Sequence, residues 1–317
     1  MMDRDALRIL KRMLMFSIVL LTLLIAVARL AGSRSNSDYY QALRLKHARL
    51  DSLDGPKAIV IGGSNGVFGL DSETLEQRLC RPVVNMALHA SLGIEFMVNQ
   101  VAGAIGPGDM VLLTMEPGMF TSESGDLELA MAMDGAMESW RYVPKPKLPK
   151  TAATFLVLRA KGAWRACTMT EGNRNGDPVY RADCFDARGD LRLSPDAIAS
   201  GSRRWSRRKS EHETIKHSVL QQIDRLSRIT VRHGAQLHFV WPSVANSADD
   251  SQFNQRTIVA LAELGIHPVG DPTRYVFPDS AFLDTPWHLK PWGRGERTSR
   301  LMEDLCRDSD CCGSSEP

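Results

Sequence analysis

The sequence predicts an α/β protein built on a doubly wound, mostly parallel sheet. Short apolar runs typical of buried strands alternate with amphipathic stretches of helical period, which indicates a sheet covered by helices on both faces. The chain has 317 residues, of which 43% are hydrophobic, so it is long enough to bury one core of roughly 250 residues. We therefore expect one main domain with appendages.

The N-terminus predicts a membrane anchor. A basic cytoplasmic tail, 1–12, precedes an apolar run, so 13–31 is expected to form a transmembrane signal anchor of roughly 19 residues. The positive flank favours a single-pass protein of the inner membrane, with the linker 32–56 and the rest of the chain in the periplasm or another extracytoplasmic space. Small residues at 26–28 leave a cleaved signal peptide as the alternative, and both interpretations export the domain.

The main domain is expected at 57–306, followed by a C-terminal tail, 307–317. Within it, periodicity predicts strands at 57–62, 82–88, 109–116 and 235–241, and helices at 71–79, 93–105, 213–233 and 294–305.

The stretch 117–210 interrupts this alternation and is interpreted as a lid-like insertion. Its proline- and lysine-rich part, 142–150, is expected to run extended over the surface. Its basic part, 203–209, is expected to be a solvated loop, with an anionic glycan or membrane headgroups as the alternative contact.

The net charge and the cysteines restrict the classes of partner, disulfide and cofactor that we expect. Thirty-nine Lys and Arg against 37 Asp and Glu give a net charge of +2, which argues against a nucleic-acid-binding face. The six cysteines permit disulfides in an oxidising compartment, and a Cys167–Cys184 bridge would pin the insertion; unpaired core cysteines are the alternative. No pair has CxxC spacing, and we expect no metal site and no cofactor.

A serine follows the first expected strand. Ser64 lies where ligands bind in a parallel sheet, at the carboxyl edge, and a helix begins there. Gly62 and Gly63 allow a tight turn and leave room for a substrate. This placement suits a nucleophile whose developing oxyanion is held by backbone N–H groups, with a helix cap or a phosphate contact as the alternative.

The far end of the chain offers a base for that serine. Asp284 lies four residues before His288 in a loop that leads into the last helix. If the loop folds closely on itself, the carboxylate reaches one imidazole nitrogen and leaves the other free to take a proton from Ser64. A structural histidine held by hydrogen bonds is the alternative for His288.

Three blocks taken together resemble the SGNH (GDSL) hydrolase superfamily: GGSN at 62–65, NMALHASLG at 85–93, and the Asp-His pair before the last helix. DTPWHLKPWGRGERT, 284–298, is similar to the membrane-anchored, exported branch that includes the alginate O-acetyltransferases and the D-alanine transfer protein of teichoic acid synthesis. The resemblance spans roughly 57–305 without the insertion, and it implies a flavodoxin-like sheet.

The resemblance implies catalytic roles for Ser64 as nucleophile, His288 as base and Asp284 as the carboxylate that orients it. The backbone N–H groups of Ser64 and Ala90 would form the oxyanion hole, with Ala90 where the family usually has glycine. Gly63 replaces the usual aspartate before the serine, which members of the anchored branch tolerate.

Three more polar residues are candidates at the same edge. Glu116 stands where the family supplies an asparagine to the oxyanion hole, so it must point away, stay protonated or contact substrate hydroxyls; alternatively, it receives backbone N–H bonds at a strand end. Asn85 ends the second strand and is expected to brace the loop that bears Ser64. His89 is expected to line the pocket.

These observations predict a serine-dependent acyltransferase that moves an acyl group, with acetyl as the expected group, to an exopolysaccharide or cell-envelope glycan. The acyl donor is unknown, and a membrane partner that hands over the acyl group is one option. A carbohydrate or lipid esterase and a non-catalytic glycan-binding envelope protein are the alternatives. In the family's fold the first and last helices cover the same face, which predicts a disulfide from Cys80 to Cys306, Cys311 or Cys312.

Overall fold

The computed structural model describes residues 4–30, 38–168, 177–195, 198 and 214–308. Its centre is a parallel sheet of order β2-β1-β3-β4-β6. The strands are β1 Ala58–Gly62, β2 Val83–Asn85, β3 Met110–Thr114, β4 Gln236–Val240 and β6 Pro268–Val269. A second, two-stranded parallel sheet pairs β5 Val244–Ala245 with β7 Val276–Phe277. The α/β class and the parallel central sheet are therefore as predicted.

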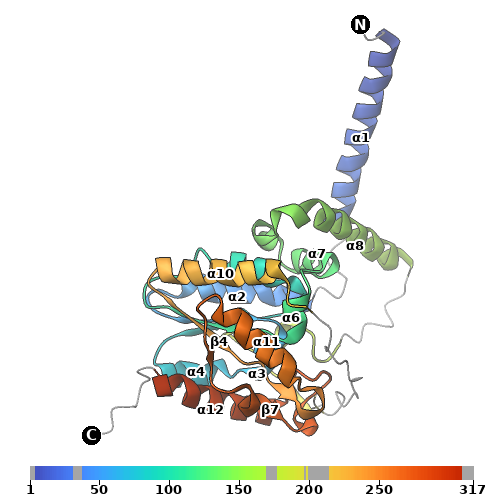
Figure 1. Cartoon of the computed structure of the whole chain (residues 1–317). Coiled ribbons are helices and arrows are strands. Elements are labelled where there is room, and N and C mark those ends of the chain that lie inside the picture. The colour runs from blue at the N-terminus through green and yellow to red at the C-terminus, as the bar shows by residue number, and fades with distance from the viewer. Residues whose placement is uncertain (1–3, 31–37, 169–176, 196–197, 199–213, 309–317) are drawn as a thin grey trace.

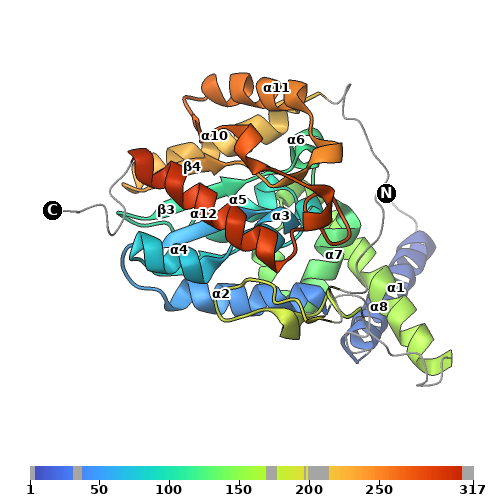
Figure 2. The same ribbon diagram turned by 90° about the horizontal axis from the view of Figure 1, so that it is seen from below.

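Helices cover both faces of the sheet (Figure 1). One face carries α3, α4 and α12, and Figure 2 looks onto this face; α5 and α10 lie on the other. The α-helices of the described residues are α1 Arg4–Leu30, α2 Ala42–Ser52, α3 Ser64–Gly69, α4 Ser72–Leu79, α5 Ile94–Val101, α6 Pro117–Thr121, α7 Asp126–Gly135, α8 Leu148–Thr168, α10 His217–Arg232, α11 Ser251–Ala262 and α12 Pro291–Asp308. The first helices after β1 and the last helix thus share a face, as expected of a doubly wound sheet.

The central strands form because their side chains are apolar on both faces. All five residues of β1 and all five of β3 are buried, which is the pattern of a strand covered by helices on either side. The helix after Ser64 is short, and α4 then begins at a cap: the side chain of Asp71 accepts hydrogen bonds from the N–H groups of Glu73 and Thr74. The strand predicted at 82–88 ends earlier, because the Asn85 side chain accepts from the N–H of Ala87 and turns the chain.

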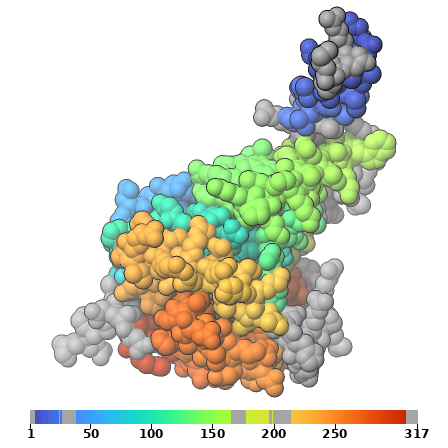
Figure 3. Space-filling view, turned by 45° about the horizontal axis from the view of Figure 1, so that its top comes forward, coloured from blue at the N-terminus to red at the C-terminus, as the bar shows by residue number. Residues whose placement is uncertain are grey.

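The N-terminal segment forms α1, which extends away from the body next to α8 (Figures 1 and 3). Among the described residues, no helix combines the length and the apolar character needed to cross a membrane. The structure therefore does not support the transmembrane helix predicted at 13–31.

The predicted linker and insertion are both part of the folded body. α2 lies inside the supposed linker 32–56, and its Leu43 is fully buried. Within the supposed insertion, α7 buries Leu129 and Met133 in the main core, and the predicted extended segment 142–150 already starts α8 at Leu148. The described part of 117–210 is consequently packed structure, and the basic stretch 203–209 lies outside the described residues.

The described cysteines include both disulfide-bonded residues and a free thiol. Cys80 and Cys306 are both disulfide-bonded, so neither is a free thiol, while Cys311 and Cys312 lie outside the described residues. Cys184 is a free thiol, so the predicted Cys167–Cys184 bridge is wrong. The loop around Cys184 is held instead by a backbone bridge between Phe185 and Leu191 and by buried polar contacts described below.

Candidate active site

Strand register brings the candidate residues to one edge of the sheet. Gly62 pairs with Thr114 across β1 and β3, so Ser64 and Glu116 each lie two residues beyond the paired ends of adjacent strands. The chain after β2 follows the same edge, where the N–H of Leu88 donates to the carbonyl of Gly62. The segments that follow β1, β2 and β3 thus meet at the carboxyl edge of the parallel sheet, as the sequence predicted.

Ser64 is the first residue of α3 and is 7% exposed. The turn before it is close-packed: a Cβ on Gly63 would lie 3.0 Å from the Cα of Ala90 and 3.0 Å from the sulfur of Met119. Only glycine fits there without displacing a neighbour. This tight approach places the backbone of the serine turn beside that of Ala90.

Two backbone N–H groups at this approach are available to a ligand. In the part of the chain that the structure describes, the N–H groups of Ser64 and Ala90 have no intramolecular acceptor. Ala90 begins the 3-10 helix η2, Ala90–Leu92. Two free N–H donors on adjacent segments are the arrangement that stabilises an oxyanion.

His288 and Asp284 meet in the tight loop before α12. Phe282 and Leu289 form an antiparallel bridge, and the N–H of Leu283 donates to the carbonyl of His288 at 2.8 Å. Within this closed loop the Nδ1 of His288 lies 2.7 Å from Oδ1 of Asp284. Because a carboxylate only accepts, Nδ1 carries the proton and Nε2 is left as the acceptor.

A phenylalanine joins this pair to the serine helix. The ring of Phe68 stacks on the imidazole of His288, with centroids 4.0 Å apart and planes 7° from parallel. Phe68 lies four residues after Ser64 in α3, so the two side chains share a face of the helix. The imidazole is therefore held alongside the face that carries Ser64. No hydrogen bond joins Ser64 and His288 among the described residues.

The pKa of Asp284 is set by opposing effects. Burial raises it, but hydrogen bonds from His288 and Tyr180 outweigh burial and hold the pKa below its ordinary value. The carboxylate is consequently anionic near neutral pH and keeps the imidazole in the tautomer that leaves Nε2 unprotonated. The side chain of His288 is only 6% exposed and that of Asp284 is 20% exposed, so water screens their contact weakly.

Glu116 is turned toward the residue after the serine. Its Oε2 accepts a hydrogen bond from Nδ2 of Asn65 at 3.2 Å. Burial raises the pKa of Glu116, although the charge of His288 and the bonds from Asn65 oppose this. Glu116 is thus a buried carboxyl that accepts a side-chain N–H bond from Asn65, and its part in an oxyanion hole or in substrate binding stays a prediction.

A buried arginine of the last helix binds the backbone next to Ser64. Arg297 of α12 is fully buried and donates to the carbonyl of Asn65 at 3.1 Å, to the hydroxyl of Thr114 at 3.0 Å and to the carbonyl of Trp241 at 2.8 Å. Burial lowers the pKa of its guanidinium to about 10, so it stays charged. Arg297 thus ties the last helix to α3 and β3.

Asn85 and His89 have structural contacts at the same edge. Nδ2 of Asn85 donates to the carbonyl of Gly66 at 3.1 Å, which is the bracing contact expected of it. Nδ1 of His89 accepts from the N–H of Ser91 at 3.2 Å and caps η2, and burial lowers the pKa of His89. Its charge is close enough to act on His288, but its role in a pocket stays a prediction.

Three residues next to the predicted triad were not anticipated from the sequence: Phe68, Asn65 and Tyr180. The first two carry a weak signal, since they lie four residues and one residue from Ser64. Tyr180 carries none, because it lies in the supposed insertion and its hydroxyl reaches Asp284 at 2.6 Å across 104 residues of chain.

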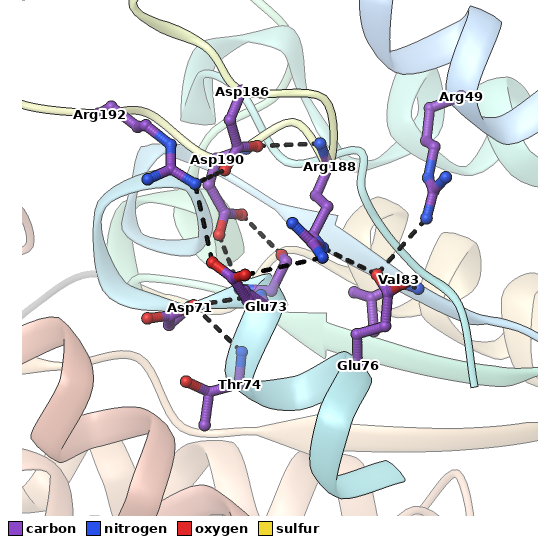
Figure 4. Close-up of polar contacts among 11 residues, drawn as sticks. Arg49, Asp71, Glu73, Thr74, Glu76, Val83, Asp186, Arg188, Asp190 and Arg192 are labelled. Carbon is purple, nitrogen blue, oxygen red and sulfur yellow. Dashed lines mark hydrogen bonds and ion pairs between the residues drawn. The ribbon is translucent and has the colours of Figure 1, made fainter. Parts of the chain in front are cut away.

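The loop that bears Tyr180 is anchored on α4 (Figure 4). Arg188 forms an ion pair with Glu76 at 2.9 Å, and Arg192 lies 3.1 Å from Asp186 of its own loop and 3.9 Å from Glu73. These pairs are half-exposed and contribute little each. They show that the loop 177–195 lies against α4.

A buried contact holds this loop more firmly. Asp190 is 3% exposed and accepts from the N–H and the hydroxyl of Ser72, both at 2.6 Å, and from Nδ2 of Asn85 at 2.8 Å. The buried ammonium of Lys46 donates to the carbonyl of Asn85 at 2.7 Å, and burial lowers its pKa to about 7. The loop 177–195 is thus packed into the core through Asp190.

No protein-family model matches this chain, and no curated protein matches it significantly. The site itself holds an oriented imidazole, a serine on the adjacent helix face and two free N–H donors.

Proposed function

We propose that this protein is a serine-dependent acyl-transfer enzyme. The observation that carries the proposal is the 2.7 Å contact between Asp284 and His288, stacked on Phe68 beside the helix face of Ser64. An imidazole that is oriented by a carboxylate next to a serine is the arrangement that generates a nucleophile. The resemblance to the SGNH hydrolases assigns the same three residues.

In the first half-reaction, Ser64 Oγ attacks the acyl carbonyl while Nε2 of His288 takes its proton. The oxyanion is held by the N–H groups of Ser64 and Ala90. When the intermediate collapses, the leaving oxygen takes the proton from His288, and the acyl group stays on Ser64. The serine and imidazole have no direct hydrogen bond in the described structure, so this contact must tighten when substrate binds.

In the second half-reaction, His288 takes a proton from an acceptor hydroxyl, which attacks the acyl-serine. Collapse returns the proton to Ser64 Oγ. The proposed acceptor is a hydroxyl of an exopolysaccharide or cell-envelope glycan, and acetyl is the proposed acyl group. This choice rests on the resemblance to the exported branch of the superfamily.

The proposal includes a location outside the cytoplasm. Disulfide bonding of Cys80 and Cys306 supports it, because such bonds form and persist in oxidising compartments. A reporter that is active only outside the cytoplasm should work when fused to the C-terminus. Activity of a cytoplasm-only reporter at that position would contradict this part of the proposal.

The function is tested with the purified full-length protein and an activated acetyl ester, with and without an oligosaccharide acceptor. Wild type should release the leaving group, and Ser64→Ala should lose at least about a thousandfold of this rate. Equal rates in the two proteins, or no turnover by either, would contradict the proposal; the second result would favour a glycan-binding role. Acetylated oligosaccharide marks a transferase, and free acetate alone marks an esterase.

A further inference from the structure

The hydroxyl of Tyr180 contacts the Asp284–His288 pair directly. It lies 2.6 Å from Oδ2 of Asp284 and 3.2 Å from Nδ1 of His288. The catalytic carboxylate therefore has two partners, one on each oxygen: Tyr180 on Oδ2 and His288 on Oδ1.

The protons of this cluster can be assigned from the chemistry of the groups. The phenol has one proton, which goes to the closer acceptor, Oδ2 of Asp284. The Nδ1–H of His288 goes to Oδ1, with the Tyr180 oxygen as a second, weaker acceptor. With one donor on each oxygen, the carboxylate cannot rotate without breaking a charge-assisted hydrogen bond.

Tyr180 is itself held in place. Its ring packs edge-on against Tyr39, with centroids 5.4 Å apart, and lies 6.0 Å from the ring of Phe68, the residue that stacks on His288. The loop that carries it is fixed further along by the buried contacts of Asp190 and by Arg294, which donates to the carbonyl of Leu191 at 2.7 Å. The hydroxyl is thus delivered by a segment that is packed on both sides of the site.

We propose that Tyr180 is a positioning residue of the triad: its hydroxyl fixes the Asp284 carboxylate in the orientation that aims Nε2 of His288 at the serine helix. This inference rests on the proposed function above. It gives the loop 177–195 a part in the site, because the loop supplies the second donor to the carboxylate.

The hydroxyl also sets how strongly Asp284 holds the imidazolium. A donor on Oδ2 draws charge away from the oxygen that faces His288. Without this donor, the carboxylate is a stronger acceptor for the Nδ1 proton and stabilises the charged ring more. Removal of the hydroxyl also takes away the weaker acceptor of the Nδ1 proton, at 3.2 Å, but the stronger bond to Oδ1 at 2.7 Å should outweigh this loss and move protonation of His288 to higher pH.

Other ionisable groups also act on the pair. Glu116 and His89 act on His288 through their charges, and Asp177 acts on Tyr180. Burial, helped by the charge of Asp284, raises the pKa of Tyr39, so this phenol is neutral and puts no charge on the pair. All four are retained when Tyr180 is replaced by phenylalanine. A shift in that variant consequently reports the missing hydroxyl.

The test compares Tyr180→Phe with Tyr39→Phe. Both remove a mostly buried phenol oxygen and keep the ring, but the hydroxyl of Tyr39 donates to the carbonyl of Leu88 at 2.9 Å and has no hydrogen bond to Asp284 in the described structure. The first readout is an NMR titration of the His288 ring in a Ser64→Ala background, which needs no activity. Tyr180→Phe should raise the midpoint by about half a pH unit or more, and Tyr39→Phe should leave it unchanged.

The second readout is the pH profile of kcat/KM in proteins that retain Ser64. Tyr180→Phe should move the acid limb to higher pH and lower kcat by about tenfold, while KM changes less than twofold. An unchanged midpoint together with an unchanged acid limb would overturn the inference, whatever happens to kcat. If wild type lacks activity, the proposed function fails, and the titration still decides the role of the hydroxyl.

Discussion

The imidazole of His288 lies flat on the ring of Phe68, with 4.0 Å between the ring centroids. Phe68 comes from the helix that begins at Ser64, whereas His288 comes from a loop more than two hundred residues later. The stack is therefore the contact through which the two halves of the proposed triad are placed relative to each other.

Phe68→Leu should lower the rate of acyl transfer without unfolding the protein. Leucine fills most of the buried volume but gives the imidazole no flat surface, so kcat should fall by about 10- to 100-fold. Phe96→Leu is the matched control, because Phe96 is fully buried in α5 and its ring contact is with Tyr142. Steady-state kinetics of both variants at equal thermal stability check this. Equal kcat values in the two would contradict a role for the stack.

Glu116→Gln should stabilise the protein near neutral pH. Burial raises the pKa of Glu116 above 4.5, so the native state binds a proton more tightly than the unfolded chain. Between these two pKa values the free energy of unfolding of wild type falls as pH rises, and the neutral amide escapes this loss. Glutamine keeps an oxygen that accepts from Asn65.

Urea unfolding of wild type and Glu116→Gln from pH 4 to 8 measures this difference. The gap should open as pH rises through the pKa of Glu116 in the folded protein and close below the ordinary value of 4.5. A gap that is constant with pH would mean that the carboxyl is not desolvated.

Asp190→Ala should destabilise the fold strongly. It removes the acceptor of three hydrogen bonds, from Ser72 and Asn85, and leaves the charge of the buried Lys46 less compensated. We expect a loss of about 3–5 kcal/mol in the free energy of unfolding. Asp183→Ala is the control: its carboxylate is 62% exposed, and it should unfold at the same urea concentration as wild type. Equal midpoints for the two variants would contradict a core role of the loop.

Much of the fold was predictable because buried strands and helices leave a periodic pattern of apolar residues in the sequence. β1, β3 and α10 were all found from apolar runs or helical period, and the Asp284–His288 contact was found from a spacing of four residues in one loop. β6 was missed, because two residues are too few to show a period. α2 was missed because its buried face includes Lys46 and His47, whose partners lie far away in the sequence.

The role of Tyr180 had no local signal at all. Its hydrogen bond to Asp284 depends on the packing of 177–195 against α4 and β2, through contacts such as Asp190 to Ser72 that span 118 residues. Sequence periodicity reports which face of an element is buried, but it does not report which distant loop crosses that face. The part of the site that comes from the supposed insertion was therefore accessible only from the structure.

The central claim is that Ser64 is a nucleophile activated by His288. It is tested most directly by incubating the full-length protein with a serine-directed acylating probe and locating the adduct by peptide mass spectrometry. Wild type should carry the adduct on Ser64, and both Ser64→Ala and His288→Ala should lose it while they keep the wild-type melting temperature within a few degrees. An adduct on another residue, no adduct in wild type, or an undiminished Ser64 adduct in His288→Ala would contradict the claim.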